Sequence, residues 1–157
     1  VTIPYKEEII KFLDVIDETA KTIGAVNTIK KINNKNIGFN TDFIGFEKSL
    51  LSLIENKKPK KALILGSGGA SKAIKYVLKK LDIYYNTVSR KKGKSELIYE
   101  NLNNEIIKSF KLIINCSPVG TYPNTNNCPN IPFKNIYMIS NVWMCNFTTP
   151  LQTQYHM

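Results

Sequence analysis

The sequence predicts an α/β protein, in which a Rossmann-type, doubly wound parallel sheet is preceded by part of a second α/β domain. From residue 62 onward, short strand-like apolar runs alternate with helical patterns, which is typical of a parallel sheet covered by helices. At the first alternation, the apolar run 62–65 breaks into a glycine-rich turn at 66–69 and a helical pattern opens at Ala70. Strand, glycine turn and helix in this order predict a dinucleotide-binding unit.

Apolar spacing places the other elements of this second region. We expect strands at 62–66, 83–89 and 111–115, a helix at 70–81, a weaker helix near 95–109 and an apolar run at 136–142. The Asn- and Pro-rich stretch 118–132 is expected to be a long loop.

The first region is expected to begin with one amphipathic helix over about 6–21. Its apolar residues recur at helical spacing, at Ile9, Ile10, Leu13, Ile16 and Ala20. Gly24 would end this helix, strands at 25–32 and 37–39 would form a hairpin, and a second helix would run from Asp42 to residue 55. The Lys-Pro run 57–61 marks a boundary, so we expect domains over 1–56 and 57–157.

Composition restricts the class of protein. The 157 residues are 43% hydrophobic, without an apolar stretch near the roughly 20 residues that span a bilayer and without a signal-peptide pattern. Three cysteines without CxxC spacing are typical of reduced thiols, so we expect a cytoplasmic protein without a metal site. The lone His156 lies near the end of the chain, which leaves a Ser-His-Asp or Cys-His arrangement without a base.

The net charge of +10 could indicate a nucleic-acid partner, but the lysines are spread along the chain. The densest basic runs, 57–61 and 90–94, lie at the boundary and after a predicted strand. No aromatic residues of the kind that stack on bases are interleaved with them, so we expect no nucleic-acid binding.

The glycine turn has a chemical interpretation. Gly66 would let the chain turn off the strand, Gly68 would let N–H groups approach a pyrophosphate, and the helix would direct its positive end at that charge. Ser71 stands where the general pattern has a third Gly or Ala. Glycine turns between strands and helices also occur for structural reasons alone, so the motif by itself is weak.

The residues after the second predicted strand favour NADP over NAD. Carboxylates at this position favour NAD, whereas here Ser89 runs into Arg90-Lys91-Lys92-Gly93-Lys94. Arg90 is the only arginine, and its planar guanidinium suits a 2′-phosphate. The alternative is an ordinary solvated basic loop.

Taken in order, the motifs resemble those of the shikimate dehydrogenase family over nearly the whole chain. These motifs are Val1-Thr2-Ile3-Pro4-Tyr5-Lys6, Gly24-Ala25-Val26-Asn27-Thr28, Gly38-Phe39-Asn40-Thr41-Asp42, the Gly66 turn, Ser89-Arg90-Lys91 with Lys94, and Asn115-Cys116-Ser117-Pro118-Val119-Gly120. The resemblance implies reversible, NADPH-dependent reduction of 3-dehydroshikimate to shikimate in aromatic amino-acid synthesis, by a monomer or homodimer.

The resemblance also implies roles for particular residues. Lys6 and Asp42 match the catalytic pair, and Thr2 and Asn27 match positions that bind the substrate. The cofactor would contact Gly66, Ser67, Gly68, Gly69, Ala70, Ser89, Arg90, Lys94, Asn115 and Ser117. Chemistry agrees for the pair, because reducing a ketone by hydride requires a proton for the developing alkoxide and a lysine beside a carboxylate can supply it.

Each role has a simpler structural alternative. Lys6 could be a solvated residue at the start of a helix, and Asp42 could be the N-cap of the helix that follows it. Asn27 and Thr28 could bond neighbouring backbone at the end of a strand.

Departures from the family pattern leave a second function open. The chain begins without Met and without the family's opening strand and helix, which carry a Ser-x-Ser pair for the substrate carboxylate, and its end lacks the closing helices with their substrate-binding Gln. Thr121, Asn141 and Trp143 replace the family's Met, Asp and Tyr. The alternatives are therefore a non-catalytic NADP-binding fragment or decayed copy, or a related enzyme acting on quinate or methylene-tetrahydrofolate.

Overall fold

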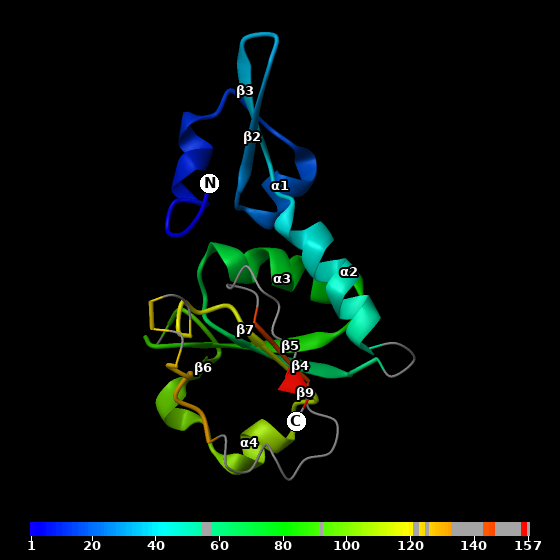
Figure 1. Cartoon of the computed structure of the whole chain (residues 1–157), viewed down its shortest axis with the longest axis vertical. Helices are drawn as coiled ribbons and strands as arrows, with labels where there is room; N and C mark the ends of the chain where they lie inside the picture. The colour runs from blue at the N-terminus through cyan, green and yellow to red at the C-terminus, as the bar shows by residue number, and fades with distance from the viewer. Residues whose placement is uncertain are drawn as a thin grey trace. The chain divides into compact units, whose positions relative to one another are not determined.

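The computed structural model describes residues 1–54, 58–91, 93–120, 123–124, 126–132, 143–146 and 155–156. The chain forms two compact units, one of residues 1–56 with 68–81 and the other of residues 57–67 with 82–157. The first unit contains a three-stranded sheet, and the second contains a six-stranded sheet (Figure 1). The predicted α/β class is confirmed.

The first unit is built on a β-hairpin. Strands β2 (Thr28–Ile32) and β3 (Lys35–Phe39) pair antiparallel, with Thr28 opposite Phe39, and lie side by side in Figure 1. Asn33 and Asn34 form the turn with φ of 48° and 61°, a left-handed conformation that Asn tolerates better than most residues. The predicted hairpin is confirmed.

The prediction of one helix over 6–21 is wrong. That segment contains a 3₁₀ helix, η1 (Glu8–Phe12), a short strand, β1 (Val15–Ile16), and a helix, α1 (Glu18–Ile23). The β-branched pair Val15–Ile16 pairs in parallel with β3, and the Asp17 side chain accepts hydrogen bonds from the N–H groups of Thr19 and Ala20. The apolar spacing therefore fits three short elements as well as one helix. Gly24 ends α1 with φ of 71°, as predicted.

Helices α2 (Asp42–Ile54) and α3 (Gly69–Lys80) complete the first unit and confirm two predicted helices. Phe46, Leu50 and Ile54 form the buried face of α2. Phe43 of α2 packs edge-on against Tyr76 of α3, with 5.4 Å between the ring centroids, and both rings lie over a small core of Ile23, Ala25 and Ala73.

The second unit contains the doubly wound sheet. Its strands are β4 (Lys61–Leu65), β5 (Tyr84–Ser89), β6 (Leu97–Ile98), β7 (Leu112–Asn115), β8 (Trp143–Asn146) and β9 (Tyr155–His156), in the order β6-β5-β4-β7-β8-β9. All neighbours are parallel except β8 and β9. From β4 the chain adds β5 and β6 on one side of that strand, and it then returns to add β7 on the other side of β4. This reversal between β4 and β7 is the point at which sheets of this kind bind ligands.

The predicted weak helix near 95–109 is wrong over much of its length. The segment contains strand β6, a 3₁₀ turn, η2 (Tyr99–Asn101), and a short helix, α4 (Asn104–Lys108). Leu97 and Ile98 pair with the end of β5, and the Asn103 side chain caps α4 by accepting from the N–H of Ile106. The apolar run 136–142 lies outside the described residues.

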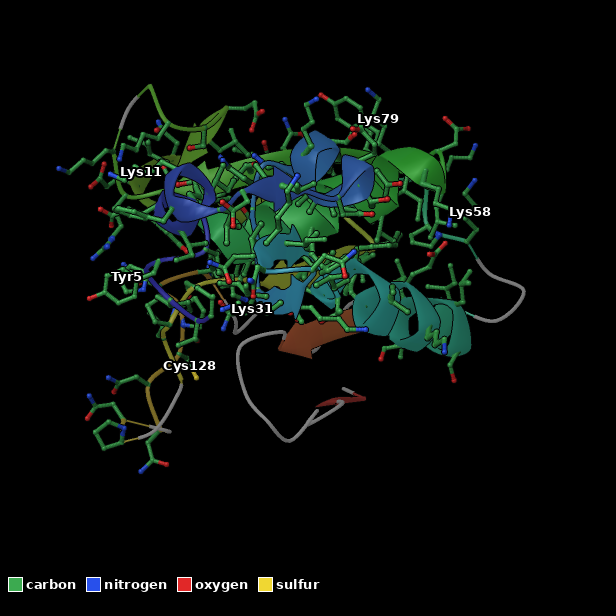
Figure 2. All side chains as sticks on the ribbon, turned by 90° about the horizontal axis from the view of Figure 1, so that it is seen from above. Tyr5, Lys11, Lys31, Lys58, Lys79 and Cys128 are labelled. Carbon is green, nitrogen blue, oxygen red and sulfur yellow. The ribbon has the colours of Figure 1, made fainter. Side chains whose placement is uncertain are left out.

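Surface lysines are distributed over several elements. Figure 2 labels Lys11, Lys31 and Lys79, which belong to η1, β2 and α3 of the first unit and are all exposed. Among the described segments, no helix is both long enough and apolar enough to span a membrane.

Replacing Gly38 or Gly45 with alanine is expected to have opposite effects on stability. A Cβ on Gly38, which is buried in β3, would collide with the Leu13 side chain and lie 2.9 Å from Val26 Cγ2, so Gly38→Ala is expected to lower the free energy of unfolding by about 1–3 kcal/mol. A Cβ on Gly45, within α2, meets nothing within 4 Å, so Gly45→Ala is expected to raise it by about 0.5–1 kcal/mol. Urea denaturation of both variants measures this, and equal effects would contradict the packing of β3.

Candidate active site

An ion pair joins the opening segment to the start of α2. Lys6 Nζ donates to Asp42 Oδ2 at 2.7 Å, and the two side chains are only 13% and 19% exposed. The backbone carbonyl of Lys6 accepts from the N–H of Val26 at 2.7 Å, which fixes the lysine's main chain beside the segment leading into β2. The structure therefore brings together the two residues expected to be catalytic.

The helix-cap alternative for Asp42 is wrong because Asn40 occupies that role. Asn40 Oδ1 accepts from the backbone N–H groups of Asp42 and Phe43 at 3.0 and 3.4 Å, and its Nδ2 donates to the carbonyl of Ala25 at 2.9 Å. Asn40 is 4% exposed, so this cap is part of the core. The Asp42 carboxylate is left to face Lys6 from the first turn of α2, where the helix dipole favours a negative charge.

Asn27 holds the second oxygen of the Asp42 carboxylate. Its Nδ2 donates to Asp42 Oδ1 at 2.7 Å and to Thr41 Oγ1 at 3.0 Å, and its Oδ1 accepts from the N–H of Thr41 at 2.8 Å. The Thr28 hydroxyl donates to the same Asn27 oxygen at 3.0 Å. The alternative that Asn27 bonds only neighbouring backbone is therefore wrong. We call Lys6, Asn27, Thr28, Thr41 and Asp42 the polar cluster.

Thr2, the other expected substrate-binding residue, lies in the opening turn. Its carbonyl accepts from the N–H of Tyr5 at 2.9 Å, and its side chain is exposed. The amino group of Val1 donates to the carbonyl of Asn27 at 2.6 Å, which places Thr2 one residue from a contact with the polar cluster.

Helix α3 begins against Lys6. A Cβ built on Gly69 would lie 3.1 Å from Lys6 Cβ, closer than nearly all side-chain contacts, whereas a Cβ on Gly68 would meet nothing within 4 Å. Gly68 precedes the helix without a side chain to cap it, and its carbonyl accepts from Ser71. Ser67 is partly buried and Ala70 is buried. The first turn of the helix that follows the glycine turn therefore lies beside the ion pair.

Gly66 meets a different constraint, in the second unit. It has φ of 108°, and a Cβ there would lie 3.1 Å from both the Cys116 carbonyl carbon and the Ser117 nitrogen. Asn115 shapes the loop that approaches it, since Asn115 Oδ1 accepts from the N–H and the hydroxyl of Ser117 and Nδ2 donates to the carbonyl of Val119. The loops after β4 and β7 therefore touch at the point where the strand order reverses.

The basic segment after β5 is shaped by Ser89. Its hydroxyl donates to the carbonyl of Lys91 at 2.7 Å and bonds the hydroxyl of Ser95 at 2.8 Å. Arg90 and Lys94 are exposed, so their cations are available to a ligand.

Tyr99 links this segment to the loop after β7. Burial raises the pKa of the Tyr99 phenol above its ordinary value of 10.0, while a hydrogen bond with the Ser117 side chain and the positive charge of Arg90 partly oppose that rise in pKa. The phenol therefore lies near residues from the ends of both β5 and β7.

Asn40, Thr41 and Tyr99 support the site, but the sequence patterns assigned them no role. Asn40 had a usable signal, because an Asn just before a helical pattern is a frequent cap. Thr41 and Tyr99 had none, since their roles depend on contacts between segments distant along the chain. Among the described residues, no group of three or more His, Cys, Asp or Glu side chains could hold a metal ion.

The fold and this geometry define a Rossmann-type α/β protein with a lysine–carboxylate pair beside the first turn of the helix after its glycine turn. The family described as "Shikimate dehydrogenase substrate binding domain" matches residues 1–29. The shikimate dehydrogenase (NADP(+)) of Methanococcus vannielii is 44% identical over 86% of this chain and 54% of its own length.

Two solved structures agree with this similarity. Shikimate dehydrogenase from Aquifex aeolicus has a TM-score of 0.75 and 38% identity, covering 93% of this chain and 56% of that one. Shikimate 5-dehydrogenase from Thermus thermophilus in complex with NADP(H) and shikimate has a TM-score of 0.71 and 27% identity, covering 85% and 52%. The chain belongs to the shikimate dehydrogenase family, and it spans about half the length of the curated relatives it matches.

Removing the Asn40 cap is expected to destabilise the start of α2, which carries Asp42. Asn40→Ala removes two N-terminal bonds of α2 and leaves the Ala25 carbonyl without its partner, so the free energy of unfolding should fall by about 1–3 kcal/mol. Asn36→Ala is the control, because Asn36 is exposed and its bonds to Asp14 are made by the backbone. Equal stability of both variants in denaturant titrations would contradict the cap.

Proposed function

We propose that this chain carries the catalytic pair and the NADP-binding sheet of an enzyme that interconverts 3-dehydroshikimate and shikimate. The observation that carries the proposal is the largely buried pair of Lys6 and Asp42 beside the first turn of α3. The similarity to NADP(+)-dependent shikimate dehydrogenases supports the substrate and the cofactor.

The polar cluster suits the proton transfer that this reaction needs. NADPH, when bound, supplies hydride to the ketone carbon. The Lys6 ammonium would stabilise the negative charge that develops on the oxygen and could donate the proton it requires. Asp42 would orient the ammonium through the 2.7 Å contact and could accept a hydrogen bond from a substrate hydroxyl. In the reverse direction, the same groups would accept the proton of the substrate hydroxyl.

Hydroxyl and amide groups around the pair suit a polyhydroxylated ring. Thr28 and Thr41 are exposed, and Asn27 is partly exposed between them and Asp42. A substrate with several hydroxyls could exchange hydrogen bonds with these groups, whereas a ligand lacking the hydroxyls would leave them unpaired. Thr2, near the Asn27 carbonyl, would extend the same surface.

The proposed cofactor residues fit a phosphate-bearing dinucleotide. The first N–H groups of α3 have no side-chain cap at Gly68, unlike those of α1 and α4, so they suit a pyrophosphate. Arg90 and Lys94 would bind the 2′-phosphate, with Ser89 fixing their loop. The resemblance to the family also assigns cofactor contacts to Gly66, Ser67, Asn115 and Ser117 of the second unit and to Gly69 and Ala70 of the first.

We further propose that residues 1–56 supply the substrate part and residues 57–157 the nucleotide part of a cytoplasmic enzyme acting as a monomer or homodimer. Cys116 and Cys128 are free thiols, which suits a reducing compartment. The parallel sheet of the second unit and the exposed Arg90 and Lys94 after β5 also support a second candidate, a non-catalytic NADP-binding module.

Shikimate-dependent formation of NADPH tests the catalytic pair. Lys6→Ala and Asp42→Asn should each lower kcat at least about 100-fold, because each removes one half of the proton-transfer and charge-stabilising pair. Lys11→Ala, at an exposed lysine of η1, should leave kcat unchanged. A Lys6→Ala variant with unaltered kcat would contradict the role, and a wild-type chain that binds NADP without turnover would establish the second candidate.

Discrimination between NADP and NAD tests the basic segment. Arg90→Ala should raise the Kd for NADP about tenfold or more, because a charged hydrogen bond to phosphate contributes about 1.5–3 kcal/mol. The Kd for NAD, which lacks the 2′-phosphate, should change less than about twofold. Fluorescence titration measures both, with Lys60→Ala as an exposed lysine control. Equal weakening of both cofactors would contradict the assignment.

A further inference from the structure

Lys72 makes contacts that nucleotide binding does not require. It lies on α3 three residues after Gly69 and therefore on the same face of the helix. Its Nζ donates to Glu7 Oε2 at 2.6 Å and to the carbonyl of Gly24, at the end of α1, at 3.2 Å. One ammonium thus joins α3 to the residue after Lys6 and to the segment that precedes β2.

Gly69 completes the same contact from the helix backbone. A Cβ there would lie 3.1 Å from Lys6 Cβ and 3.7 Å from Glu7 Cγ, so a side chain at this position would displace the Lys6–Glu7 segment by a few tenths of an ångström. Lys72 and Gly69 therefore both meet the Lys6–Glu7 segment, Lys72 through its ion pair with Glu7 and Gly69 through its lack of a side chain beside Lys6.

These contacts surround Lys6 without touching its ammonium. Its carbonyl bonds Val26, its Cβ lies against Gly69, and its neighbour Glu7 is paired with Lys72. The direction of the Lys6 side chain toward Asp42 depends on the position of this backbone. Displacement by about 1 Å in a catalytic arrangement can lower rates about 100-fold.

The pair contributes little to global stability. The side chains of Lys72 and Glu7 are 35% and 46% exposed, and ion pairs of this kind typically contribute about 0–1 kcal/mol. A purely stabilising role thus explains little of why three segments are joined here.

We propose that Lys72 and Glu7 are positioning residues, which hold the Lys6 backbone against the first turn of α3 so that its ammonium meets Asp42. This inference rests on the proposed function for its kinetic consequences, but the placement of Lys6 can be measured without turnover. Lys72 lies on α3, the helix that we propose receives the pyrophosphate. Cofactor binding and the placement of Lys6 therefore depend on the same helix.

The test combines amine labelling with kinetics in Lys72→Met, Glu7→Gln and Lys72→Arg. A brief pulse of acetic anhydride, read by mass spectrometry of the Lys6 peptide, measures how well the ion pair with Asp42 shields the Lys6 amine. Lys72→Met and Glu7→Gln should each raise Lys6 acetylation at least about threefold, and Lys72→Arg should restore shielding because it keeps the charge. In Lys72→Met and Glu7→Gln kcat should fall about tenfold, while the Kd for NADP changes less than about twofold, and Lys72→Arg should keep kcat near the wild-type value.

The control is Lys80→Met, which breaks the other ion pair of α3, that with Glu47 at 2.8 Å. It should leave Lys6 acetylation and kcat unchanged. Unaltered Lys6 acetylation in Lys72→Met, or an equal rise in Lys80→Met, would overturn the positioning role. If the chain has no turnover, the labelling result still decides this inference, so its failure is distinguishable from failure of the proposed function.

Discussion

The ion pair between Lys6 and Asp42 is the interaction on which the first unit's arrangement depends. Its partners are 36 residues apart in sequence, and each is held by a different part of the structure. The lysine is fixed through its backbone by Val26, and the aspartate through Asn27 and the cap at Asn40. Two charges that are mostly removed from water need this many supports, because an unpaired charge there would be costly. The segments beside the hairpin and at the start of α2 thus hold Lys6 and Asp42 in contact.

Close packing against neighbouring segments constrains the glycine-rich turn, in addition to its proposed contact with a phosphate. Gly66 leaves room for the loop after β7, and Gly69 leaves room for the segment carrying Lys6. Of the glycines in this turn, Gly68 alone has open space where a side chain would be, so it is the one whose identity is best explained by a ligand. Packing within the chain therefore explains Gly66 and Gly69 by itself, whereas Gly68 is explained only by the proposed nucleotide contact.

Much of the fold could be predicted because local signals agreed with tertiary structure. The apolar run at β4, the turn at Gly66 and the asparagines of the hairpin all favour the structure that forms. Prediction failed where short elements shared a helical spacing, at 6–21 and 95–109, since Asp17 and Asn103 cap later helices that periodicity alone does not separate. The pairing of Lys6 with Asp42 was expected only from the resemblance to the shikimate dehydrogenase family. Asn40 caps α2 locally, and an Asn just before a helical pattern predicts such a cap. The supports at Thr41 and Tyr99 depend on contacts between distant segments, which no local pattern reports.

The turn at Asn33 and Asn34 has a consequence far from its own position. It sets which residue of β2 faces which residue of β3, and the same two strands continue into Asn27 on one side and Asn40 on the other. Gaining or losing one residue at the tip would shift this register and turn alternate side chains to the opposite face. The amide that holds Asp42 would then point away from it. A change in the length of this turn would therefore disturb the site, although the side chains of Asn33 and Asn34 lie in solvent.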